Sequence, residues 1–64
     1  MKNFRDEVNA IMSVLADAVI DAEKFDKGNE SAGRRAWVEL RDVEKRCACI
    51  RKDILAESKE RRED

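Results

Sequence analysis

The sequence contains no proline, no histidine and no tyrosine, and only two of its 64 residues are glycine. Proline breaks helices and glycine weakens them, so their scarcity favours long, uninterrupted helices. The missing histidine removes the commonest general base, and Ser13, Ser31 and Ser58 have no activating base at triad-like spacing. These absences indicate that the protein is not an enzyme and uses neither a cofactor nor a small-molecule substrate.

Long apolar runs are missing as well. A membrane span needs roughly 20 apolar residues in a row, and the apolar stretches of this chain are far shorter. The first residues mix Lys2 and Arg5 with Asp6 and Glu7, whereas a secretory signal has a basic start and an apolar stretch. We therefore expect no membrane association and a cytoplasmic location.

Charge is what the chain has in abundance. Charged residues make up 45% of the sequence, with 14 basic against 15 acidic side chains and a formal net charge of −1. The two signs are unevenly distributed: residues 1–26 hold 3 basic and 6 acidic residues, while residues 34–52 hold 7 basic and 3 acidic ones. This pattern predicts an acidic first half and a basic second half.

Two ladders of apolar residues recur with alternating steps of four and three. The first is Phe4, Val8, Ile11, Leu15, Ala18, Ala22 and Phe25, and the second is Ala36, Leu40, Val43, Cys47, Ile50 and Ile54. This spacing is typical of a helix that faces a partner helix along one seam. We expect one helix over about residues 2–26 and another over about 30–60, with a frayed, solvated end from Ser58 to Asp64.

A short break separates the two ladders at residues 27–29. Gly28 suits the left-handed residue that ends a helix, and Asn29 suits the N-cap of the next one. So short a connection makes the two helices antiparallel neighbours. The predicted fold is therefore all-α, a single antiparallel two-helix hairpin over residues 1–64.

The apolar band of the first helix is wider than one partner needs, because Met12, Val14, Val19 and Ile20 lie beside its seam. A chain this short also buries little surface on folding, so the isolated chain is only marginally stable. Both points predict a homodimer, a four-helix bundle or coiled coil. The oligomer interface is predicted at Met12, Leu15, Val19, Trp37 and Leu40.

Two groups of residues are candidates for a metal or redox site. Asp17 and Asp21 lie four apart on one helical face, but a solvated acidic face is the simpler interpretation than a metal site. Cys47 and Cys49 point to different sides of one helix, so they cannot chelate one ion together. Cys47 is expected in the core, and Cys49 is expected to face outward, where a redox role is a minor alternative.

Basic residues of the second helix form a stripe. Arg34, Arg41, Lys45, Lys52 and Lys59 are separated by 7, 4, 7 and 7 residues. This spacing places them together on the face opposite the seam. Such a stripe is able to follow a phosphate backbone, although a solvated face with acidic neighbours is the alternative.

The sequence around the break reads Lys27-Gly28-Asn29-Glu30-Ser31-Ala32-Gly33-Arg34-Arg35-Ala36, with Ile50-Arg51-Lys52 later. It resembles the bacterial linker-histone-like family of small nucleoid proteins, which share a Lys-Gly-Asn and Ala-Gly-x-Arg-Ala turn. The resemblance implies a self-associating hairpin that binds or compacts DNA. The positions expected to bind DNA are Lys27, Arg35, Arg51 and Lys52 from the resemblance, and Arg34, Arg41 and Lys45 from the stripe.

A second hypothesis stays open beside DNA binding. The chain is slightly acidic, and Trp37, Val38 and Ile20 lie off the seams. These features favour a structural or adaptor module that binds another protein, for example a small phage or virion component.

Overall fold

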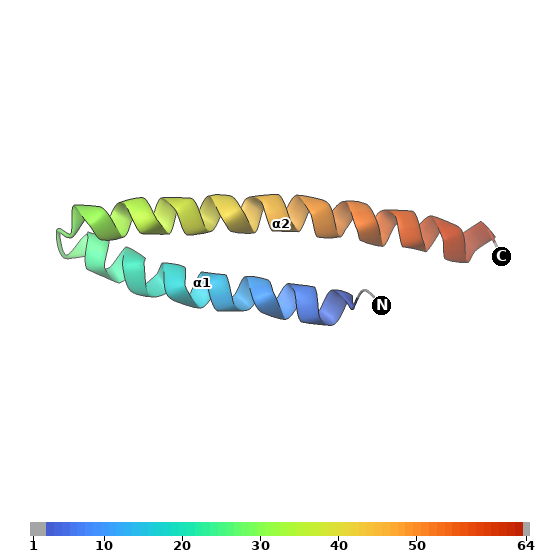
Figure 1. Cartoon of the computed structure of the whole chain (residues 1–64), viewed down its shortest axis with the longest axis horizontal. Coiled ribbons are helices and arrows are strands. Elements are labelled where there is room, and N and C mark those ends of the chain that lie inside the picture. The colour runs from blue at the N-terminus through green and yellow to red at the C-terminus, as the bar shows by residue number, and fades with distance from the viewer. Residues whose placement is uncertain (1–2, 64) are drawn as a thin grey trace.

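The computed structural model of the chain describes residues 3–63, with side chains described to residue 62. It contains two helices, α1 over Phe4–Asp26 and α2 over Glu30–Glu63. They run antiparallel along a rod of 55 × 15 × 15 Å, which confirms the two-helix hairpin (Figure 1). The helix start expected near residue 2 and the end of the chain at Asp64 lie outside the described residues.

Asparagine side chains cap both helices. Asn3 Oδ1 accepts hydrogen bonds from the backbone N–H groups of Arg5 and Asp6, at 3.0 and 3.3 Å. Asn29 Oδ1 accepts one from the backbone N–H of Ala32, at 3.1 Å. These bonds satisfy N–H groups that have no partner within their own helix, so both starts are encoded locally.

The turn between the helices follows from Gly28, whose φ angle is +102°. Its N–H donates to the Phe25 carbonyl at 2.9 Å, and the next N–H, that of Asn29, donates to the Lys24 carbonyl at 3.0 Å. These two bonds satisfy the last carbonyls of α1 while the left-handed glycine reverses the chain. The end of α1 and the start of α2 thereby share one tight connection.

The second helix is longer, with 34 residues against 23. Phe4, at the start of α1, lies beside Ile54, Glu57 and Ser58, so the last turns of α2 extend beyond α1 (Figure 1). The prediction of a frayed end from Ser58 was wrong for the described residues, because α2 stays helical to Glu63. The Arg61 guanidinium pairs with the Glu57 carboxylate one turn earlier, at 3.4 Å, which supports this end.

The contact between the helices differs from the predicted seams. The buried apolar side chains are Ile11, Ala18, Ala32 and Ala36. Leu15 and Leu40, both predicted in a seam, are 39% and 52% exposed. Positions Glu7, Val14 and Asp21 lie inward instead, because α1 is rotated by about one position from the predicted seam.

Small residues near the turn explain that rotation. Ala32 is completely buried, and Gly33 has the Phe25 ring where a Cβ atom would otherwise be. The two backbones therefore approach closely at this end, and the larger apolar side chains are left outside the contact. Among the described residues, no large apolar side chain is fully buried.

Candidate nucleic-acid interface

The basic stripe lies on the outer face of α2. Arg34, Arg41, Lys45, Lys52 and Lys59 are all exposed. They lie about half a helical turn away from Ala36, Val43 and Ile50, which face α1. At about 1.5 Å per residue, the stripe is about 37 Å long, close to the roughly 34 Å of one turn of B-DNA.

The other predicted DNA contacts lie elsewhere. Lys27 is the C-cap of α1 at the turn, exposed at one end of the rod. Arg51 lies beside Ala48, Ile54 and Leu55, next to Lys52 of the stripe but on the side of α2 that carries these apolar residues. The structure therefore aligns Arg34, Arg41, Lys45 and Lys52 but does not bring Lys27, Arg35 or Arg51 onto the same line.

Arg35 has a structural partner that the sequence did not reveal. Its Nε donates to Asp21 Oδ1 of α1 at 3.1 Å, and Asp21 is only 7% exposed. The expectation that Asp21 belongs to a solvated acidic face was wrong. Because Arg35 itself is half exposed, this pair links the helices along one side of the hairpin.

Glu39 completes a small charged cluster with this pair. Burial favours a raised pKa for Asp21, but the hydrogen bond from Arg35 and the charges of Arg35 and Lys24 outweigh it and lower that pKa. Burial, together with the neighbouring carboxylates of Asp21 and Asp17, raises the pKa of Glu39 above its ordinary value. Glu39 Oε1 is also buried without a hydrogen-bond partner. The spacing of 21, 35 and 39 across a turn carries no periodic signal, so pattern reasoning missed this cluster.

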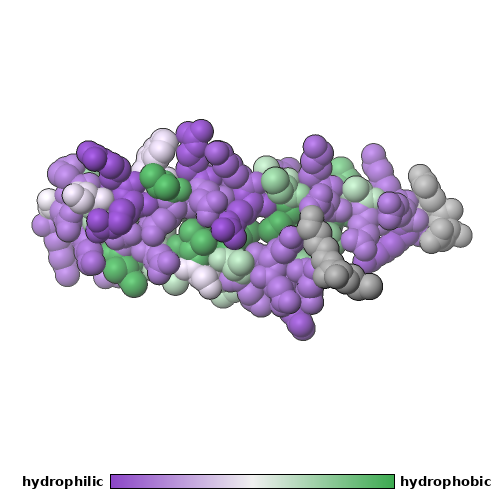
Figure 2. Space-filling model, viewed as in Figure 1, coloured by the Kyte–Doolittle hydropathy of each residue, from purple (hydrophilic) through white to green (hydrophobic). Residues whose placement is uncertain are grey.

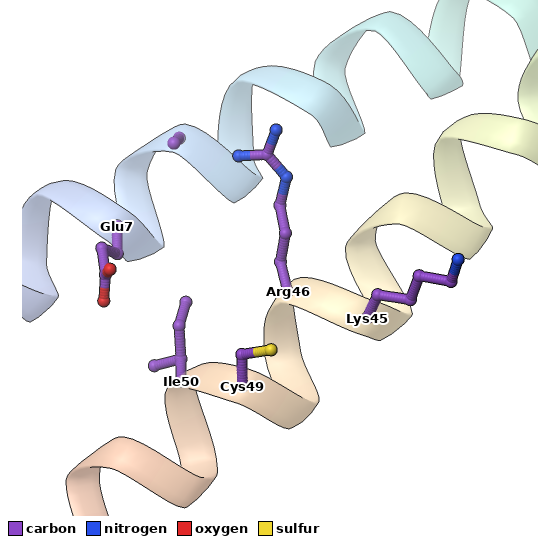
Figure 3. Close-up of a pocket in the computed structure, with 6 residues that line it drawn as sticks. Glu7, Lys45, Arg46, Cys49 and Ile50 are labelled. Atoms are coloured by element: carbon purple, nitrogen blue, oxygen red, sulfur yellow. The ribbon is translucent and has the colours of Figure 1, made fainter.

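A pocket lies farther from the turn, on the same side of the hairpin as this charged cluster. It is lined by Glu7, Lys45, Arg46, Cys49 and Ile50 (Figure 3). The Arg46 side chain extends from α2 toward α1, and its Nε donates to Asp42 at 3.0 Å. Within the described part of the chain, no group of three acidic, cysteine or histidine residues is arranged to hold a metal ion.

The two cysteines have the orientations that were predicted. Cys47 is half buried and Cys49 is exposed, and both are free thiols.

An apolar surface covers the opposite side. A groove near the turn is lined by residues of both helices, among them Ala22 of α1 and Trp37 and Leu40 of α2. Helical spacing continues this side along α1 through Leu15 and Val8. We name this surface the apolar face. It comprises Val8, Met12, Leu15, Val19 and Ala22 of α1, and Trp37, Leu40, Ile54 and Leu55 of α2.

All five residues predicted at an oligomer interface belong to the apolar face. Their exposed fractions are 62% for Met12, 39% for Leu15, 57% for Val19, 61% for Trp37 and 52% for Leu40. The space-filling view shows apolar side chains reaching the surface among hydrophilic ones (Figure 2). So much exposed apolar area on a rod this thin is typical of a surface that another protein covers.

Trp37 joins the apolar face to the basic stripe. The Arg41 guanidinium lies 5.5 Å from the centre of the Trp37 ring, within the range of a cation–π contact. This contact places the Arg41 charge at the border between the two surfaces.

No described helix is long and apolar enough to cross a membrane. The fold and surfaces define a small helical hairpin with a basic outer stripe and an apolar side. The model of the histone H1-like protein Hc1 family matches residues 1–60, so this chain belongs to that family. No curated protein and no solved structure shows a significant match to the chain.

Proposed function

We propose that this chain is a DNA-binding and DNA-compacting protein of the nucleoid that acts as a dimeric helical bundle. The observation that carries the proposal is the basic stripe of α2 in a chain of the histone H1-like family. Arg34, Arg41, Lys45 and Lys52 present cations along one line, the arrangement that phosphate contacts require. Contacts with phosphates carry no sequence information, so binding through such contacts is independent of base sequence.

The overall charge makes the position of the stripe decisive. A net charge of −1 gives no general attraction to DNA, so affinity depends on local contacts with phosphates. Each phosphate neutralised contributes about −0.9 to the slope of log affinity against log salt, so four contacts in each chain give a slope of about −3.6 per chain and about −7 for a dimer that uses both stripes on one duplex. Lys27, Arg35 and Arg51 are secondary contacts in this proposal, since none of them lies on the stripe.

A salt series with fluorescence anisotropy tests the proposal. Arg41→Ala and Lys45→Ala together should reduce the slope by about two for each chain bound and weaken binding to all DNA sequences equally. Arg5→Ala is the matched control, because Arg5 is an exposed cation on α1, outside the stripe. Equal losses in the control and the stripe variant, or no binding at low salt, would refute DNA binding through this surface.

The dimer is supported by the apolar face and by the small core. Among the described residues, the buried apolar side chains are those of Ile11 and three alanines. Burial of apolar surface contributes about 25 cal/mol per Å², so covering the half-exposed Leu15, Val19 and Trp37 is a large gain relative to that core. Light scattering should give twice the mass of the chain.

A protein-binding adaptor is the second candidate. Ile20 and Val38 are 53% and 54% exposed and lie outside the apolar face, so dimerisation does not cover them. Val38 lines a groove with Val14, Asp17 and Lys45. A dimer that shows no salt-dependent DNA binding would favour this candidate, and Val38→Ser should then weaken binding to the partner.

A further inference from the structure

We infer that two hairpins pair with their turns at opposite ends, so that α1 packs on α1 of the copy and α2 on α2 of the copy. In this dimer the two basic stripes lie on one side of the bundle. The inference rests on the proposed dimer and adds its geometry, which determines whether a dimer holds one DNA duplex or bridges two.

The first argument is the symmetry of the α1 part of the apolar face. Val8 and Ala22 lie seven residues before and after Leu15, and Met12 and Val19 lie between them. The five positions carry no charge, and their pattern reads nearly the same in both directions. Such a stripe fits an antiparallel copy of itself, with Leu15 next to the two-fold axis.

The second argument is that the α2 part contains charges. Glu44 lies seven residues after Trp37, and Arg51 lies beside Leu55, so both lie along the apolar face. In the alternative dimer, with both turns at one end, α2 would cover α1 of the copy. Glu44 and Arg51 would then face an apolar stripe without partners, which is unfavourable for buried charges.

Pairing of α2 with an antiparallel α2 removes this difficulty. Val14 lies opposite Glu39 and Asp42, so an axis at Leu15 crosses α2 near residue 42. Glu44 then lies against the segment of the copy that contains Arg41, whose side chain already leans over Trp37. Arg51 lies against the start of α2 of the copy, where Asp26 and Glu30 line the groove together with Arg34. Glu44 thus meets a basic group, and Arg51 meets a groove with two acidic groups and one basic group.

The arrangement has a direct consequence for DNA. The stripe of each α2 points away from its own α1, and the two α2 helices are neighbours in this bundle, about 10 Å apart. Both stripes therefore point the same way, and the acidic first helices, residues 1–26 with 3 basic and 6 acidic residues, lie on the far side. The dimer has one basic side and holds a single duplex. In the alternative dimer the stripes point in opposite directions and would bridge two duplexes.

Disulfide trapping distinguishes the two dimers. In a Cys47→Ala, Cys49→Ser background, Leu15→Cys should cross-link to itself about tenfold faster than Asn9→Cys, because a disulfide needs Cα atoms within about 7 Å. Asn9 is the matched control, since it is exposed and lies outside the apolar face. Both sites lie outside the buried core, and circular dichroism verifies that the variants remain helical.

Mixtures of two cysteine variants test the alternative dimer. In the alternative dimer, Leu15→Cys should cross-link to Leu40→Cys of the other chain in preference to itself, and the protein should join two labelled duplexes in an energy-transfer assay. Either result overturns the inferred arrangement while leaving a dimeric DNA-binding protein intact. A monomeric mass in light scattering overturns both the arrangement and the dimer, and the anisotropy series tests DNA binding separately.

Discussion

Gly28 and Gly33 are close in sequence but have different roles. Gly28 has a φ angle of +102°, and a Cβ atom added there would meet nothing within 4 Å. Gly33 has ordinary helical geometry, but an added Cβ atom would overlap the Phe25 ring. The first glycine is needed for backbone conformation and the second for the close approach of two helices.

Replacing Gly28 with valine should destabilise the hairpin by about 2 kcal/mol, because a β-branched residue is strained at positive φ. Gly28→Asn should lose about 1 kcal/mol or less, since asparagine tolerates this conformation. Thermal unfolding followed by circular dichroism measures both. Equal stability of the parent and the valine variant would contradict the turn geometry.

The effect of Gly33→Ala on stability should change sign when Phe25 is also replaced. Alone, the added methyl group displaces the Phe25 ring and destabilises the protein. In a Phe25→Ala background the clash is gone, and the better helix propensity of alanine should stabilise α2 by up to about 1 kcal/mol. Urea unfolding of the four proteins forms a double-mutant cycle. Additive effects would show that Phe25 and Gly33 are not in contact.

At the scale of the helices, apolar packing and one charged cluster jointly hold α1 against α2. The packing near the turn is made by alanines, which bury little area. The bond between Arg35 and Asp21 crosses the same region at 3.1 Å, and Glu39 adjoins it with a raised pKa. The contact between the elements is therefore sensitive to pH.

Acid should act on this contact in two opposite steps. Glu39 has a raised pKa in the folded state, so stability rises as pH falls through that pKa toward the ordinary value of 4.5. Asp21 has a lowered pKa, so its contribution is lost as pH falls from the ordinary value of 3.8 through its folded value. A stability maximum in mild acid should result, measured by urea unfolding at several pH values.

Glu39→Gln is the matched variant for the first step. It removes the carboxyl group that titrates with a raised pKa, so the rise in stability between neutral and mildly acidic pH should disappear. The loss at lower pH should remain, because Asp21 still pairs with Arg35. An unchanged rise would assign it to another carboxyl group.

At the scale of the whole molecule, many large apolar side chains lie on the outside of the hairpin. Leu15, Trp37 and Leu40 are each more exposed than any residue of the core. In the proposed dimer a second copy covers these side chains, so folding and association would form one equilibrium. The same pairing would set the two basic stripes relative to each other.

The melting temperature should therefore rise with protein concentration. Leu15→Lys should lower it and remove the concentration dependence, because the lysine would lie at the centre of the pair. Ile20→Lys makes the same change at an exposed position outside the apolar face and should have little effect. Calorimetry at several concentrations measures these changes, and a concentration-independent parent would argue against the dimer.

Much of the fold was contained in the sequence. The 4–3 spacing predicted two helices, and Gly28 with Asn29 predicted the break between them. These signals are local: a cap or a turn needs only the bonds of neighbouring residues. The short connection also predicted that the two helices are antiparallel. The position of the stripe followed from the same periodicity, since spacing alone places residues on one side of a helix.

The side of each helix that meets the other depends on contacts in the folded hairpin. On α1, Ile11 and Ala18 belong to two possible contact faces. One face also contains Glu7, Val14 and Asp21, and the other also contains Val8, Leu15 and Ala22. Apolar periodicity favours the second set, which is the more apolar. The structure takes the first set, because alanines near the turn bring the backbones together and Arg35 reaches Asp21. That rotation places Leu15 and Leu40 on the outside. Contacts between residues far apart in sequence determined it, and no local pattern encodes them.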